Sequence, residues 1–263
     1  MPSLAVVSAK GAPGVTVCAA ALVAMAHNPA VSSEGAILVE ADPAGGDLEV
    51  LAGSRTGEPS LLHAAADLRR DGSPEALVAH GVEAVSGLPG LLAPVAAHAA
   101  GPVVEAVSGS LLPALAAVAG WVVLDGGRWD RSQPSARRIV GADVVAAVCR
   151  STAVSIAHAR DLILPLRTAS PSSTVVVIQV GNDPYPPAQT AEVVDVPVLG
   201  PLAWDPKGVT GLWAGGATSR WRSHSALARS ARQLLDELAV VADARPTWDR
   251  QGVNGHSPQE AAR

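Results

Sequence analysis

The 263-residue sequence predicts an α/β domain that is built on a mainly parallel sheet. Short apolar runs alternate with longer helical patterns along the chain, as expected for successive strand–helix units. Several of these runs end in an acid or a glycine, which is typical of strand ends at the ligand-binding edge of an open sheet. No linker or repeat divides the first 243 residues, so we expect one domain over 1–243 and a polar, disordered tail over 244–263.

The composition limits the kinds of core and partner that the protein can have. The chain is 48% hydrophobic and contains no Phe, so its core must consist mainly of Ala, Val and Leu. A net charge of −5 gives no overall attraction to nucleic acid or anionic lipid. The two cysteines lie in apolar segments, as buried thiols do in a reducing compartment. The seven histidines show no metal-ligand spacing.

The first expected strand, over 4–7, leads through the small-residue stretch from Ser8 to Thr16 into an alanine-rich helix over 17–25. This is the arrangement of a phosphate-binding loop, because the backbone N–H groups at the helix start point at the anion. Thr16 lies where a hydroxyl reaches a Mg²⁺ ion. Val15 stands where the usual pattern has a lysine, although Lys10 lies five residues earlier. A Gly/Pro turn without a ligand is the alternative interpretation.

The second expected strand, over 36–39, ends in two acids at alternate positions, Glu40 and Asp42. Such acids point to the same side of the sheet, where they could hold Mg²⁺ or orient a water molecule. A solvated turn with a helix N-cap at Asp47 is the alternative. A later strand over 121–124 runs directly into Asp125, followed by Gly126 and Gly127, which matches the Mg²⁺-associated acid of phosphate-loop proteins.

The remaining elements complete the alternating order. We expect surface helices within 54–80, a strand over 82–85, a core-facing helix over 102–119, a helical segment over 136–140, a strand over 143–148, a helix over 152–166, a strand over 173–180, an edge strand over 196–202, a loop over 204–208 that opens a short helix, and a final helix over 223–241. Residues 15–26 also have features of a secretory signal, but their preceding charge is poor. We expect no transmembrane segment, because Ser, Gly and Pro interrupt the uncharged stretch 106–124.

These motifs, in this order, resemble the ParA/MinD family of deviant P-loop ATPases. The resemblance covers about residues 3–240 and is carried by the segments 10–16, 40–43, 124–126 and 197–206. It implies a three-layer P-loop NTPase-like fold with helices on both faces of a mainly parallel sheet. It also implies binding of ATP or ADP with Mg²⁺, and a homodimer. Cleavage as a secretory signal would remove the first strand and the loop, so the resemblance rules that interpretation out.

The resemblance also implies roles for individual residues. Lys10 matches the lysine that reaches across the dimer to the partner's phosphates, and Glu40 stands where the family has an acid that positions the attacking water. We therefore expect Lys10 and Glu40 to be catalytic. The expected Mg²⁺ ligands are Thr16, Asp42 and Asp125. The expected nucleotide contacts are Lys10, Gly11, Ala12, Pro13, Gly14, Val15, Thr16 and Val17 in the loop, with Asn182, Asp205 and Pro206 near adenine.

The departure at Val15 removes a charged contact with the phosphates, so we expect weakened nucleotide binding and at most weak ATP hydrolysis. The favoured hypothesis is a cytoplasmic positioning switch or scaffold, held at a membrane or pole by a protein partner in a pilus, secretion or division machine. The departures resemble the pilus-localisation, TadZ-like branch of the family. One alternative is an active ATPase that partitions DNA and binds it through the basic cluster over 220–232, which a solvated helix face would also explain. Another is an α/β interaction module without nucleotide.

Overall fold

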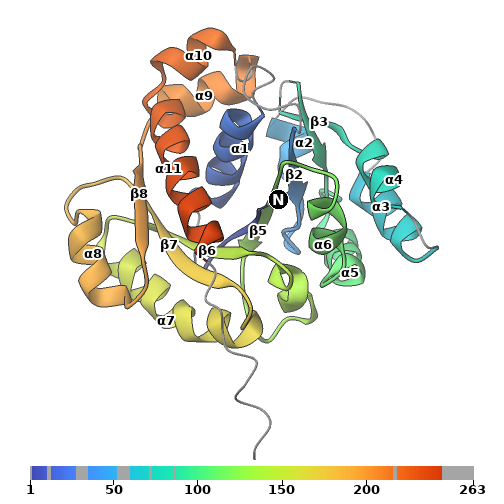
Figure 1. Ribbon diagram of the computed structural model, residues 1–263, viewed down its shortest axis with the longest axis horizontal. Coiled ribbons are helices and arrows are strands. Elements are labelled where there is room, and N and C mark those ends of the chain that lie inside the picture. Colours follow the sequence, from blue (N-terminus) through green and yellow to red (C-terminus); the bar gives the residue numbers. More distant parts are fainter. Residues whose placement is uncertain are drawn as a thin grey trace, which may run out of the picture.

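The chain forms one twisted sheet, seen in a computed structural model that describes residues 2–10, 13–27, 35–51, 60–70, 73–85, 87–215 and 218–244. The strands of this described part are β1 (Ser3–Ser8), β2 (Ala36–Glu40), β3 (Val82–Val85), β4 (Leu88–Leu91), β5 (Trp121–Arg128), β6 (Val144–Arg150), β7 (Thr174–Val180) and β8 (Val198–Leu202). Their order across the sheet is β3-β4-β2-β5-β1-β6-β7-β8. All neighbouring strands are parallel except β3 and β4, which confirms the predicted α/β class (Figure 1).

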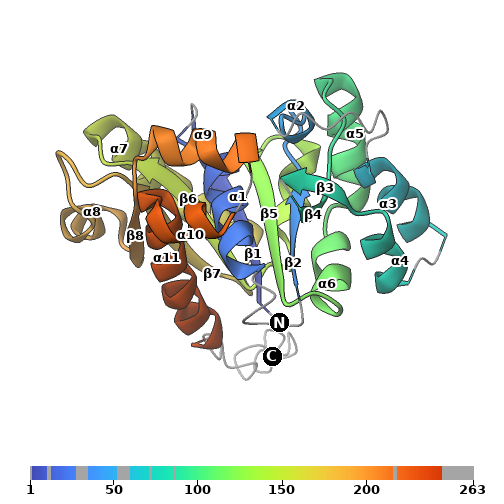
Figure 2. The ribbon, with the colours of Figure 1, turned by 90° about the horizontal axis from the view of Figure 1, so that it is seen from above.

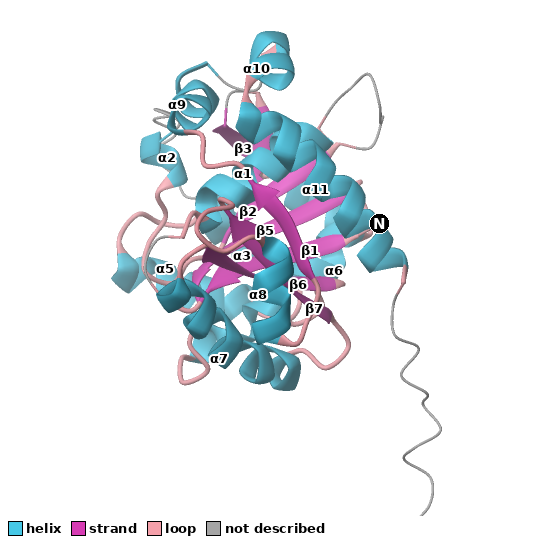
Figure 3. Cartoon of the chain, turned by 90° about the vertical axis from the view of Figure 1, so that its left-hand side faces the viewer, coloured by secondary structure: helices cyan, strands magenta, loops and turns pink. Residues whose placement is uncertain are grey.

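Helices cover both faces of the sheet and make the fold three-layered. They are α1 (Val15–Ala26), α2 (Leu48–Leu51), α3 (Ser60–Leu68), α4 (Pro74–Ala79), α5 (Ala97–Val107), α6 (Leu111–Ala116), η1 (Pro134–Ile139), α7 (Ala153–Ala169), α8 (Pro187–Val194), α9 (Pro206–Gly215), α10 (Ser219–His224) and α11 (Ala226–Asp243). Residues of α1, α9, α10 and α11 share one core cluster, and residues of α3 to α8 share the other. Figures 2 and 3 show the strands lying between these two layers.

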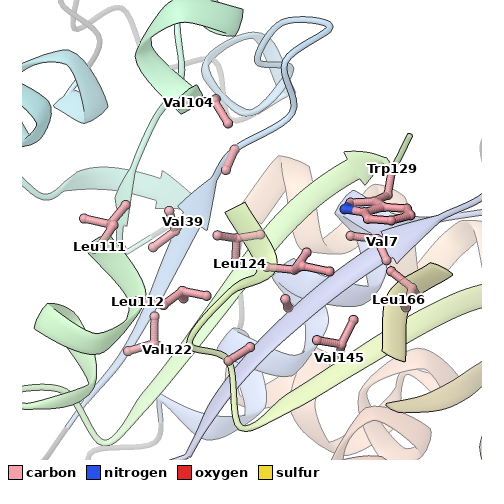
Figure 4. Close-up of a cluster of buried hydrophobic side chains, with 14 of the residues drawn as sticks. Val7, Val39, Val104, Leu111, Leu112, Val122, Leu124, Trp129, Val145 and Leu166 are labelled. Atoms are coloured by element: carbon pink, nitrogen blue, oxygen red, sulfur yellow. The ribbon is translucent and has the colours of Figure 1, made fainter. Parts of the chain in front are cut away.

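The central strand β1 is apolar from Leu4 to Val7 because both of its faces are buried. Leu4 and Val6 pack in the cluster beneath α1 and α11, and Ala5 and Val7 pack in the opposite cluster. Figure 4 shows part of this opposite cluster, where Val7 lies close to Trp129. The alternation of sides explains why a continuous apolar run at the start of the chain correctly predicts a central parallel strand.

The structure differs from the sequence prediction at several elements. The single helix expected over 102–119 is two helices, α5 and α6, because Gly109 adopts a left-handed φ of 84° between them. The sequence prediction lacks β4 and α8, which are short and contain or follow prolines. The strand predicted over 82–85 is present as β3, at the edge of the sheet. The predicted tail over 244–263 lies, apart from Ala244, outside the described residues.

No helix in the described part of the chain combines the length and the hydropathy that crossing a membrane requires.

Candidate nucleotide site

A cavity of about 490 Å³ opens at the carboxyl ends of the parallel strands. This is the edge where ligands bind in open α/β sheets. Its lining comes from β1, β5, β6, β7 and β8, from the start of α1, and from the loops before α2 and α9. The residues are Ser8, Pro13, Gly14, Val15, Thr16, Val17, Asp42, Asp47, Gly127, Arg128, Arg150, Val180, Leu202, Trp204, Asp205, Pro206 and Val209. The volume lies within the range of ordinary small-molecule sites.

The first turn of α1 forms one wall of this cavity. Gly14 adopts a left-handed φ of 107° and is the N-cap, so the helix begins at Val15 without a side-chain cap. The first turn also contains no acid. The N–H groups at this end therefore present a partial positive charge to the cavity, which favours an anion there. Five of the residues expected to contact a nucleotide, from Pro13 to Val17, line the cavity.

The expected magnesium ligands lie together at the base of the site. Asp125 is 2% exposed, and its carboxylate accepts hydrogen bonds from the Thr16 hydroxyl and from the Gly127 N–H, the latter at 3.1 Å. Burial raises the pKa of Asp125 to about 6. Burial also raises the pKa of Asp42, although the Ala44 N–H donates to its carboxylate at 2.8 Å. A hydroxyl and two carboxylates are the oxygen ligands that Mg²⁺ prefers.

Gly127 brings the C-terminal end of β5 into close contact with Asp42. A Cβ atom at this glycine would lie 1.8 Å from Asp42 Oδ2, and the φ of 56° is left-handed. Only glycine satisfies both conditions without displacing the carboxylate. In the described residues, no group of three or more His, Cys, Asp or Glu could hold a metal, so a bound Mg²⁺ would rely on Thr16 as well as the two acids.

Arg138, a buried arginine of η1, was not predicted as a site residue. Its guanidinium donates to the carbonyl oxygens of Gly126, Arg128 and Ser135 at 2.6 to 3.0 Å. Burial lowers the pKa of Arg138 to about 10, while the charges of Asp42 and Asp125 oppose that shift. Arg138 therefore fixes the backbone at the C-terminal end of β5. Its sequence context, a short polar segment after a proline, gives no sign of this role.

Glu40 is placed differently from the catalytic position that the sequence analysis expects. The side chain is 2% exposed and does not line the cavity. Its Oε1 accepts from the N–H groups of Asp47 and Leu48, at 2.6 and 2.8 Å, and its Oε2 accepts from Ala93 N–H at 3.1 Å. Burial raises the pKa of Glu40 to about 7. Its carboxylate connects two loops and is not directed at a ligand in this arrangement.

The residues expected near adenine also need correction. Asn182 is exposed and does not line the cavity, whereas Asp205 and Pro206 do. The Asp205 carboxylate accepts from Gly208 N–H at the start of α9, and from Ala226 and Leu227 N–H at the start of α11. Burial raises its pKa, but these bonds more than offset that effect and lower it below the ordinary value. Asp205 therefore caps the starts of two helices through its carboxylate.

Arg150, which the sequence analysis did not assign to the site, lies at the same wall with Trp204 of the predicted loop over 204–208. The guanidinium carbon of Arg150 lies 4.3 Å from the centre of the Trp204 ring, and both residues line the cavity. Trp204 is 60% exposed. An exposed tryptophan at the end of a strand, in the loop over 204–208, was the available signal. Such a planar surface suits a flat aromatic ligand.

Three predicted loop contacts are not part of the described cavity lining. Lys10 is exposed and does not line the cavity. Gly11 and Ala12 lie outside the described residues. Val15 lines the cavity with 6% exposure and can offer only its backbone N–H. The structure therefore confirms that Val15, and no lysine, lies at the first residue of the helix facing the cavity.

The basic cluster over 220–232 is partly occupied with structural contacts. The Arg222 guanidinium donates to the carbonyl oxygens of Ala24 and His27 at the end of α1, the latter at 3.0 Å. Arg229 donates to the carbonyl oxygen of His224 at 2.9 Å. Arg222 therefore stabilises the C-terminus of α1, where carbonyl groups lack partners within the helix. These contacts favour a structural explanation of the cluster over a surface reserved for DNA.

Solved structures share this fold, although no protein-family sequence model and no curated protein sequence matches the chain. A ParA family ATPase from Chlorobium tepidum TLS is 17% identical, with a TM-score of 0.69 over 88% of this chain and 97% of the other. The cell division ATPase MinD from Pyrococcus furiosus is 17% identical, with a TM-score of 0.70 over 91% and 99%. MinD from Pyrococcus horikoshii OT3, complexed with Mg-ADP, is 17% identical, with a TM-score of 0.64 over 92% and 98%. The chain therefore has the fold of the ParA/MinD ATPases.

Proposed function

We propose that this protein is a ParA/MinD-like member of the P-loop ATPases that binds ATP or ADP with Mg²⁺ in the cavity. One observation carries the proposal: Thr16, Asp42 and Asp125 converge beneath the uncapped start of α1. The N–H groups of α1 bind phosphate oxygens, and the Thr16 hydroxyl and the two carboxylates hold the metal. When bound, Mg²⁺ neutralises charge on the phosphates.

The same arrangement supports slow hydrolysis. Val15 supplies no charge to the phosphates, so part of the transition-state stabilisation that a loop lysine gives is missing. The Glu40 carboxylate accepts three backbone hydrogen bonds and does not line the cavity, so it is not available to orient a water molecule. We propose that the protein acts through its nucleotide-bound conformation, with at most weak ATPase activity.

Calorimetry tests the nucleotide proposal directly. The wild-type protein should bind ATP with Mg²⁺ and lose at least tenfold in affinity when EDTA removes the metal, because the carboxylates then repel the phosphates. Thr16→Val keeps the shape of the side chain and removes its hydroxyl, so it should weaken binding only when Mg²⁺ is present. If the wild type bound neither ATP nor ADP at millimolar concentration, the nucleotide-free interaction module would be the better description.

Phosphate release tests the proposal about hydrolysis. Turnover should stay well below about 1 s⁻¹, the lower end of ordinary enzymes. Turnover at an ordinary rate that Lys10→Ala abolishes would contradict the proposal, because it would give the exposed Lys10 the missing catalytic charge. Sedimentation with and without Mg-ATP tests the expected homodimer, in which Lys10 contacts the phosphates of the other copy.

The finer biological role is also a proposal. A positioning switch or scaffold for a pilus, secretion or division machine requires a protein partner, so a fluorescent fusion should concentrate at a pole or surface structure. A uniform distribution in the cell would contradict this role. The alternative of DNA partitioning predicts salt-dependent DNA binding that is independent of sequence. We do not favour it, because Arg222 and Arg229 bond backbone carbonyl groups.

A further inference from the structure

The cavity has an unusual balance of charge for a phosphate site. Its lining carries the carboxylates of Asp42 and Asp47, and Asp125 lies directly beneath. At the position of the usual loop lysine it has Val15. A nucleotide polyphosphate placed here carries more negative charge than one Mg²⁺ neutralises, so a cationic side chain from elsewhere in the chain would stabilise it. Resting on the proposed function, we propose that Arg128 binds the terminal phosphates of the nucleotide and replaces the missing loop lysine.

Arg128 lies at the correct edge of the cavity. It is the last residue of β5, and in the parallel ladder it pairs with Ser8, the last residue of β1 before the loop. Both residues line the cavity. Ser8 and Arg128 therefore border the same space as the first turn of α1, which favours an anion.

The backbone of Arg128 is fixed on both sides while its side chain is exposed. Its N–H donates to the Asp42 carboxylate, and its carbonyl oxygen accepts from Arg138 Nη2 at 2.6 Å. These bonds hold the Cα atom in place, so a ligand contact would order only the side chain. The charge of Arg128 also helps to lower the pKa of Asp130, but solvent screens this attraction.

The other basic residues near the described site are less suited to this contact. Lys10 does not line the cavity, and Arg150 is stacked over Trp204. Arg138 is buried and directs its nitrogens at three carbonyl oxygens. Of these four basic residues, Arg128 is therefore the one that lines the cavity and can reach a phosphate without breaking a ring contact or a hydrogen bond to a carbonyl oxygen. Its planar guanidinium can bind phosphate oxygens through two parallel hydrogen bonds.

A titration of nucleotides with one, two and three phosphates tests this assignment. Calorimetry with Mg²⁺ should show wild-type affinity rising from AMP to ADP to ATP. Arg128→Ala should weaken ATP binding by about 10- to 100-fold, as loss of a charge-assisted contact does, and leave AMP binding within about twofold. Arg128→Lys should restore part of the affinity for ATP. Arg131→Ala is the matched control, because Arg131 is an exposed arginine three residues away that does not line the cavity.

The outcomes separate this inference from the proposed function. If the wild type binds ATP and Arg128→Ala binds it equally well, the inference is wrong and the proposed function stands. If Arg128→Ala weakens AMP and ATP by the same factor, the residue is structural and the inference is again wrong. Arg128→Gln keeps most of the side chain but not its charge. An equal loss of ATP affinity in this variant excludes a folding defect of Arg128→Ala as the cause of the loss. Failure of the wild type to bind any of the three nucleotides would refute both.

Discussion

Replacing Asp125 with Asn should stabilise the metal-free protein and at the same time abolish Mg²⁺-dependent nucleotide binding. The carboxylate is 2% exposed, and burial is the main reason that its pKa lies near 6. The charges of Asp42 and Asp47 act in the same direction, and the bonds from Thr16 and Gly127 oppose it. An asparagine side chain at this position has nearly the same shape without the charge. This is the conflict between function and stability expected at a site built to hold a metal.

The size and sign of the effect follow from the pKa. Its rise from 3.8 to about 6 means that the ionised carboxylate destabilises the folded state. At about 1.4 kcal/mol per pKa unit, the upper limit is about 3 kcal/mol. Below the pKa that Asp125 has in the unfolded chain, the carboxyl is protonated in both states and does not lower the free energy of unfolding. As the pH rises through about 6, the carboxyl ionises in the folded protein and that stability is lost. Allowing for lost hydrogen bonds, we expect a gain of about 1 to 2 kcal/mol at pH 8, or a Tm about 2 to 6 °C higher.

Thermal unfolding in EDTA, followed by circular dichroism at pH 8 and pH 4.5, measures this difference. The gain from Asp125→Asn should be large at pH 8 and small at pH 4.5, where the wild-type carboxyl is protonated in the folded protein. Asp130→Asn is a matched control, because Asp130 is not buried in the core and its pKa is lowered by bonds from Ser132. A variant that is less stable than the wild type at pH 8, or a gain that is equal at both pH values, would refute the reasoning.

Three further substitutions test the corrected roles, each by urea denaturation. Gly127→Ala should destabilise the fold by about 1 to 3 kcal/mol, because its Cβ would lie 1.8 Å from Asp42 Oδ2; an unchanged midpoint would contradict the geometry. Asp205→Ala should cost about 2 kcal/mol, since it removes the acceptor at two helix starts, and a purely ligand-binding role predicts no such loss. Glu40→Ala leaves three backbone N–H groups unpaired and should cost at least about 2 kcal/mol; if it instead abolished hydrolysis without destabilising the fold, Glu40 would be catalytic.

The elements that the sequence predicts best are those determined by local patterns. The apolar run before the loop, the small-residue loop and the alanine-rich helix are confirmed as β1 and α1, because strand and helix formation here follow from neighbouring residues. The strand before Glu40 ends where the sequence places it, whereas β5 continues past Asp125 to Arg128. Prediction fails at Gly109, which breaks an apparently continuous helix, and at β4, which a proline and a glycine disguise.

The direction of a carboxylate is harder to predict than its position along the chain. Glu40 and Asp42 are two residues apart and follow the same strand, yet only Asp42 lines the cavity. Glu40 instead accepts from Ala93, which is 53 residues away in the sequence. Asp205 caps α11 through residues about 20 positions later. Which backbone N–H groups lie near such a side chain depends on how distant loops pack.

The amino-acid sequence by itself determined the α/β class, the phosphate-loop arrangement at the start of α1 and the absence of a lysine at Val15. Those features depend on residue type and on spacing within a few turns of the chain. Only the tertiary structure decided that Arg138 bonds the end of β5, that Arg150 stacks on Trp204 and that Arg128 borders the cavity. The placements of Arg150 and Arg128 depend on strands that are distant in sequence, because a parallel sheet brings their carboxyl ends to one edge.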